Sequence, residues 1–161
     1  MKGKTGKESS IIVSYITQPQ DANRVGNVHG GVVMKQIDSA AALVATRHAR
    51  SNCVTASVDR LDFFHPVFIG NLLILKASLN MVGRTSMEVG VRAETEDPLT
   101  GEVHHTASAY LTFVALDDDG RPREVPPLIL ESEEDKRRNQ EALSRRERRL
   151  SEKKRLRKVK Y

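Results

Sequence analysis

The apolar residues between positions 31 and 50 recur at intervals of three and four, which is the spacing of a helix. The positions concerned are Val33, Ile37, Ala40, Ala41 and Val44. Such a period gathers these side chains on one side of a helix, and that side is expected to face a core. The pattern therefore predicts one long amphipathic helix over residues 31–50.

Five further segments have the length and composition of strands. They cover residues 10–17, 53–63, 72–82, 86–95 and 104–116, and glycine, proline and aspartate clusters separate them. One strand, one helix and four more strands, joined by short turns after the helix, predict an α+β fold with one antiparallel sheet wrapped around the helix. A sheet of this kind leaves an edge strand exposed, which a two-fold partner could cover.

The two ends of the chain differ from residues 10–130, which are predicted to form the single domain. Residues 1–9 are polar and are expected to be disordered. Residues 1–130 carry 13 Lys and Arg against 14 Asp and Glu, whereas residues 131–161 carry 13 against 7. The positive charge of the chain therefore belongs to its C-terminal segment.

Residues 131–161 are predicted to form a charged helix or tail. Its large apolar residues are Leu143, Leu150, Leu156 and Val159. Four roles stay open: a solvated helix, a subunit clamp, a phosphate-binding arm or disorder. Acidic residues interrupt the basic ones and Tyr161 is the only aromatic residue, so we expect no nucleic-acid partner.

The cellular compartment is predicted from cysteine content and hydropathy. Cys53 is the only cysteine, which excludes an intramolecular disulfide and fits a reducing compartment. We find no apolar leader and no run of eighteen apolar residues, so neither secretion nor a membrane span is predicted. A cytoplasmic protein is expected.

Asp38 is the first candidate for chemistry. It follows Ile37 on the apolar helix and precedes a run of small residues, and a carboxylate there costs free energy unless it is paired or used. Such a group suits a general base. Gly30 and Gly31 at the helix start could turn their N–H groups towards a developing oxyanion. The alternative is that the glycines only form a tight turn and that Asn27 caps the helix.

Other chemistries find less support in the sequence. No His and Cys cluster has metal-ligand spacing and no G-x-S-x-G motif is present, so we predict neither a metal site nor a serine triad. Cys53 is interpreted as a packing residue. The turn that contains Arg84, Thr85 and Ser86 offers a cation, hydroxyls and free amides to a phosphate, or is an ordinary β-turn with a solvated arginine.

Four motifs in order carry a resemblance to a known family. They read GNVHGGVVMKQID, VTASVDRLDFFHPVFIGNLL, VGRTSMEVGV and TASAYLTFVALDDDGRPREVPPL. Together they resemble the hotdog-fold acyl-CoA thioesterases, in particular the brain-type acyl-CoA hydrolases and their short bacterial relatives. The resemblance runs from about Ile11 to Leu128.

The resemblance implies hydrolysis of fatty acyl-CoA to free fatty acid and coenzyme A, with coenzyme A as part of the substrate and no separate cofactor. It implies that Asp38 acts as base or nucleophile while Asn27, Gly30 and Gly31 polarise the thioester carbonyl. The residues expected to contact coenzyme A are Arg84, Thr85, Ser86, Thr55 and Arg60.

The resemblance also implies a partner, because in the family the asparagine of one unit faces the aspartate of another. We therefore expect a homodimer that shares its active sites, assembled further into a tetramer or hexamer. Two alternatives stay open: an acyl-CoA-binding sensor or regulator without catalysis, and a hotdog dehydratase or hydratase. The second fits less well because the nearest histidine upstream of Asp38 is His29, in the loop.

Overall fold

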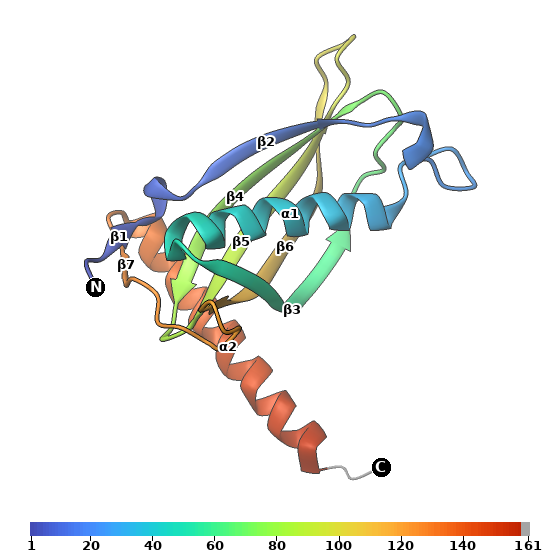
Figure 1. Cartoon of the computed structure of the whole chain (residues 1–161). Coiled ribbons are helices and arrows are strands. Elements are labelled where there is room, and N and C mark those ends of the chain that lie inside the picture. The colour runs from blue at the N-terminus through green and yellow to red at the C-terminus, as the bar shows by residue number, and fades with distance from the viewer. Residues whose placement is uncertain (159–161) are drawn as a thin grey trace.

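The computed structural model describes residues 1–158 and confirms the predicted α+β arrangement. A five-stranded antiparallel sheet curves around helix α1 (Gly30–Ala49), and helix α2 (Glu133–Lys158) lies against the opposite face of the sheet (Figure 1). The sheet has the order β2-β4-β5-β6-β3 and is formed by β2 (Ile11–Ile16), β3 (Asn52–Phe63), β4 (Leu72–Val82), β5 (Ser86–Glu96) and β6 (Val103–Leu116). No described helix is long and apolar enough to cross a membrane.

The core lies between α1 and the concave face of the sheet. All five apolar residues that the helical period selected are buried, at 4% exposure or less. They pack with inward-facing residues of three strands: Leu73, Leu75, Met87, Val89, Leu111 and Phe113. Each fully buried side chain of this size contributes about 1.5–3 kcal/mol. The helix begins and ends one residue earlier than predicted.

The predicted strands are found within one residue of their expected ends, and β4 matches its prediction at both ends. Strand β3 lies at the edge of the sheet, and its only neighbour among the described residues is β6. Its side chains Val54, Val58 and Phe63 are each about half exposed. A twelve-residue edge strand with apolar side chains is an open template for pairing with another chain.

The N-terminal segment was expected to be disordered, and the structure corrects this for residues 4–8. Strand β1 (Lys4–Thr5) pairs with β7 (Leu128–Ile129), and a 3-10 turn (Gly6–Glu8) follows; a second 3-10 turn (Pro19–Asp21) follows β2. The Lys4 ammonium donates to the backbone oxygen of His48 at 2.7 Å. Carbonyls in the last turn of a helix lack intrahelical partners, so they attract donors such as this one.

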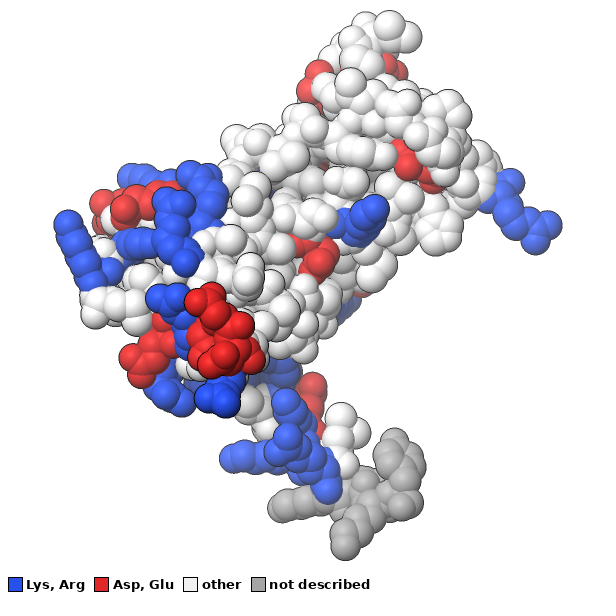
Figure 2. All heavy atoms as spheres, viewed as in Figure 1, with Lys and Arg blue, Asp and Glu red and all other residues white. Residues whose placement is uncertain are grey.

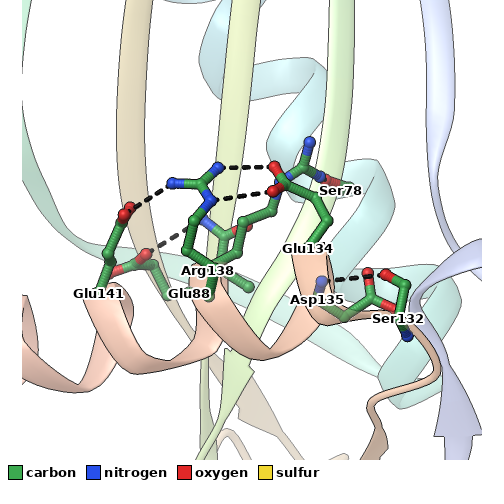
Figure 3. A network of polar contacts seen from close by, with 9 residues as sticks. Ser78, Glu88, Ser132, Glu134, Asp135, Arg138 and Glu141 are labelled. Carbon is green, nitrogen blue, oxygen red and sulfur yellow. Dashed lines mark hydrogen bonds and ion pairs between the residues drawn. The ribbon is translucent and has the colours of Figure 1, made fainter.

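Helix α2 resolves part of the question about the C-terminal segment, because the described residues 133–158 are helical rather than disordered. Figure 2 shows Lys and Arg side chains gathered along its far end. Ser132 caps the helix: its hydroxyl accepts from the Asp135 N–H, and the Asp135 carboxylate accepts from the Ser132 N–H, both at 3.0 Å (Figure 3). Val159 and Tyr161 lie outside the described residues.

A buried ion pair fixes α2 to the outer face of the sheet. The Glu88 side chain on β5 is fully buried and accepts from Arg145 of α2 at 2.7 Å. The Arg145 guanidinium also lies 3.7 Å from the centre of the Tyr110 ring. The Asn80 amide donates to the same carboxylate at 3.2 Å. Removing one member of a buried pair leaves an uncompensated charge, so these contacts hold the helix in one position.

His48 in the last turn of α1 is a buried group that resists protonation. Its ring is fully buried, its Nε2 lies 2.8 Å from the Pro126 oxygen and its Nδ1 has no partner among the described residues. Because Pro126 offers only an acceptor, we assign the proton of the neutral ring to Nε2. Burial lowers the pKa of His48 below its usual value of 6.5.

The lowered pKa of His48 predicts a loss of stability in mild acid. The unfolded chain takes up this proton as the pH falls through about 6.5, whereas the folded chain takes it up only at lower pH. The free energy of unfolding should therefore fall from pH 7 towards pH 5, measured by urea unfolding at several pH values. His48→Gln should flatten this dependence, whereas His104→Gln, on a half-exposed ring, should not. Equal slopes in all three proteins would contradict the assignment.

Candidate active site

Asp38 and Thr55 meet between α1 and the edge strand. The Thr55 hydroxyl donates to Asp38 Oδ1 at 2.6 Å. Thr55 lies opposite Phe113 in the β3–β6 register, and this places it on the inward side of the sheet that faces α1. Asp38 is half-buried, and its Oδ2 has no hydrogen bond among residues 1–158. One oxygen is therefore held in orientation while the other stays available to a water molecule.

The start of α1 corrects one expectation about the glycine amides. The helix is capped by His29 rather than Asn27: His29 Nδ1 accepts from the Gly31 N–H at 2.9 Å. The Gly31 amide is thus already used, which the sequence prediction had not anticipated. The Gly30 N–H takes part in none of the hydrogen bonds found in residues 1–158. Gly30 is therefore the open donor at this end of the helix.

Asn23 is a polar residue that the sequence reasoning missed. Its Oδ1 accepts from the backbone N–H groups of Val25 at 3.0 Å and Asn27 at 3.2 Å. These two bonds fix the plane of the carboxamide, and its Nδ2 has no partner among the described residues. The signal was present in the sequence, because an asparagine that begins a tight loop bonds to backbone groups two residues on.

The described hydrogen bonds of Asn27 are those of its backbone. Its oxygen accepts from the Asn23 N–H at 2.7 Å, and it forms a bridge with Phe68. The loop as a whole is tied to β2, since the Tyr15 hydroxyl donates to the buried Asp21 at 2.8 Å and this bond raises the pKa of Tyr15. These hydrogen bonds hold the loop in a fixed position at the N-terminal end of α1.

The turn between β4 and β5 lies at the other end of the domain. The Thr85 oxygen accepts from the Ala115 N–H at 3.0 Å, next to the start of β3, whereas Gly30 faces Phe63 at the end of β3. Twelve residues of strand span about 36 Å at about 3.3 Å per residue. One protomer therefore does not bring Arg84, Thr85 and Ser86 to the start of α1.

The arginine of this turn is open to solvent. The Arg84 side chain lies 3.7 Å from Glu124 and borders a hollow of about 400 Å³ between the turn and the start of α2. Arg60, the other arginine expected to contact coenzyme A, pairs instead with Asp62 on its own strand at 2.6 Å. Arg84 is thus the better placed of the two to receive a phosphate.

Other reactive groups of the domain have structural partners. Burial raises the pKa of the Cys53 thiol, which keeps it protonated and a poor nucleophile. The His104 ring stacks on His65 at 3.9 Å, and His105 lies 2.8 Å from the Ser108 hydroxyl. Within residues 1–158 no three His, Cys, Asp or Glu side chains are grouped so that they could hold a metal ion.

Comparisons with known proteins agree with this architecture. A family model described as the thioesterase superfamily matches residues 25–102. An uncharacterized acyl-CoA thioester hydrolase from Bacillus subtilis is 40% identical over 129 residues, which is 80% of this chain and 75% of that protein. A crystal structure of a hexameric acyl-CoA thioesterase is 39% identical and superposes with a TM-score of 0.90 over 94% of this chain and 97% of its own.

A second solved structure is of an enzyme in which an asparagine, an aspartate and a threonine have been substituted. The acyl-CoA hydrolase of Staphylococcus aureus, in complex with butyryl coenzyme A and coenzyme A, is 36% identical with a TM-score of 0.88, over 97% of this chain and 95% of its own. Alanine variants of that enzyme at one asparagine, one aspartate and one threonine have also been solved. Its asparagine precedes the aspartate by 15 positions, and its threonine follows by 17. By sequence, fold and motif order, the chain belongs to the family of hotdog-fold acyl-CoA thioesterases.

Proposed function

We propose that this protein hydrolyses fatty acyl-CoA thioesters to free fatty acid and coenzyme A, with Asp38 as the general base. The observation that carries the proposal is the Thr55–Asp38 hydrogen bond, which orients one carboxylate oxygen and leaves the other open. Asp38 Oδ2 takes a proton from water as the water oxygen attacks the thioester carbonyl carbon. The carbon–sulfur bond then breaks, and the coenzyme A thiolate leaves and takes back the proton held by Asp38, which restores the carboxylate.

The carbonyl oxygen needs donors as negative charge develops on it. The Gly30 N–H and the Nδ2 of Asn23 are open donors at this end of α1 among the described residues, and the Asn23 carboxamide is the one whose plane is fixed by two backbone N–H groups. Asn23 precedes Asp38 by 15 residues and Thr55 follows it by 17, which are the spacings of the three substituted residues in the S. aureus enzyme. Asn27, the residue predicted first, is only 11 positions from Asp38. We therefore assign carbonyl polarisation to Asn23 in place of Asn27.

The site requires two copies of the chain. Asp38 lies eight residues beyond Gly30, or about 12 Å along the helix axis, so the donors and the base of one protomer do not converge on one carbon. Two β3 edges paired antiparallel across a two-fold axis would bring the start of one β3 beside the end of the other. The same pairing brings Arg84 of one copy towards the α1 start of its partner, where it can bind the phosphates of coenzyme A with Thr85 and Ser86.

We also propose an oligomeric assembly, a cellular compartment and a cofactor requirement for this protein. Assembly of such dimers into a hexamer is supported by the hexameric acyl-CoA thioesterase, which superposes over 94% of this chain. The protein is proposed to act in the cytoplasm, because its only cysteine suits a reducing compartment. It is proposed to need no cofactor besides the coenzyme A of its substrate.

Asp38→Asn tests the role of the base. The amide keeps the acceptor for the Thr55 hydroxyl but cannot take a proton from water, so kcat should fall by about a hundredfold or more. The measurement is release of coenzyme A from a panel of acyl-CoAs with a thiol reagent. Asp97→Asn, in the β5–β6 turn, is the matched control and should leave kcat unchanged. Near-wild-type turnover in a folded Asp38→Asn protein would remove the central assignment.

The variants Asn23→Asp and Asn27→Asp test which of the two asparagines donates to the substrate carbonyl. Aspartate at position 23 keeps the oxygen that accepts from Val25 and Asn27 but loses the donor to the substrate carbonyl. We expect kcat/KM to fall by about 100-fold for Asn23→Asp, the loss typical of an oxyanion donor, and less than threefold for Asn27→Asp. Both proteins should unfold at the wild-type temperature within a few degrees. The reverse order of activities would return the role to Asn27.

A further inference from the structure

Helix α2 crosses the outer face of the sheet in one direction, strand by strand. Near its start, Arg138 reaches the Ser78 hydroxyl on β4 at 3.4 Å (Figure 3). Arg145 then binds Glu88 on β5, and Arg149 donates to Asp59 on β3 at 2.8 Å. From Arg138 to Arg149 the helix rises about 16 Å, and the step from β4 to β3 is three strand spacings, or about 14 Å. The helix therefore runs across the strands towards the β3 edge.

The last part of α2 extends past that edge. Arg149 contacts the edge strand itself, and residues 150–158 continue the helix for about 13 Å more. Figure 1 shows this part of the helix standing clear of the sheet. Every residue from 150 to 157 is exposed in the protomer. The extension is long enough to cover two further strands, and no strand formed by residues 1–158 lies beyond β3 at this edge.

The underside of the extension has the character of a contact surface. Leu156 follows Arg149 by seven residues, so both lie on the side of the helix that faces the sheet, and Leu156 is 67% exposed. On that side of the helix its neighbours are Glu152 and Lys153, four and three residues before it, and Arg155 and Arg157 flank it. The surface therefore combines one apolar side chain with surrounding charges whose sum is positive.

The outer side of β3 is complementary to this surface. The register with β6 places Val54, Ser57 and Asp59 on that side, and Val54 is 47% exposed. Asp59 on that side is already paired with Arg149 of its own protomer. The Asp62 side chain is paired with Arg60 but is still 44% exposed. Two β3 strands meeting edge to edge would therefore present two half-exposed Asp62 carboxylates and two exposed valines along the seam. The half-exposed Asp62 carboxylates can receive cations of the helix end, and Leu156 and Val54 can pack together.

We propose that residues 150–158 of α2 form a strap that passes over the β3 edge and docks on the outer side of β3 in a second copy of this chain. The inference rests on the two-fold dimer of the proposed function and adds a second, independent contact to it. Each copy extends one strap, so the β3 seam is covered on its outer side twice. The strap stabilises the assembly that completes the active site without touching the site itself.

Dimer dissociation measured by analytical ultracentrifugation tests the strap. Deleting residues 151–161 leaves the Arg145 and Arg149 anchors in place, and the dissociation constant should rise tenfold or more. Leu156→Glu should raise it at least fivefold, whereas Leu99→Glu, in the β5–β6 turn and 94% exposed, should not change it. An unchanged dissociation constant of the dimer after the deletion would overturn the strap. If the deletion instead abolished binding to duplex DNA or to anionic vesicles while the dissociation constant stayed the same, the segment would serve that partner and the strap would again be wrong.

A crosslinking experiment keeps the strap separate from the shared site. In a Cys53→Ser background, one tagged copy carries Leu156→Cys and a differently tagged copy carries Val54→Cys, and a short bismaleimide is added after subunit exchange. A crosslink between the two tags is the expected result. If the dimer persists with an unchanged dissociation constant and no such crosslink, the strap is wrong and the shared site stands. An active full-length monomer would overturn both.

Discussion

The burial of one side of α1 against the concave sheet is the constraint on which the site depends. Val33, Ile37 and Ala41 are almost completely buried, so the helix can neither rotate nor slide without losing that packing. Asp38 and the Gly30 amide are therefore held about 12 Å apart along a rigid axis. A base and an oxyanion donor at that separation serve different thioester carbons, and this is the reason for proposing that two copies share each site.

Strand β3 has a different task on each of its sides. On the inward side, the Thr55 hydroxyl orients Asp38. On the outward side, Asp59 receives Arg149 from the helix that crosses the sheet. The same strand is one of the two edges of the sheet, so the proposed pairing of two β3 strands would join catalytic residues and helix anchors at one seam. Chemistry and assembly are then linked through a single strand.

The sequence predicted most of the fold because the spacing of apolar residues and the turn residues at the ends of each element are local signals. Strand β4 and the buried side of α1 around Ile37 are examples. It could not predict contacts that depend on tertiary structure. The order of residues 4–8 requires the His48 carbonyl as acceptor, and α2 is fixed by Arg145 bonding Glu88, 57 residues away. Asn23 and Asn27 share one loop, and only the hydrogen bonds of the folded chain show that the carboxamide of Asn23 is the one held in a fixed orientation.

Complementation between inactive variants tests the shared site most directly. Asn23→Asp and Asp38→Asn proteins are mixed under conditions of proven subunit exchange, and acyl-CoA hydrolysis is followed over time. A site built from two copies predicts that each heterodimer regains one intact site, which is roughly a quarter of wild-type activity after complete random exchange. No recovery despite exchange, or full activity in a wild-type sample that is monomeric at the assay concentration, would contradict the account.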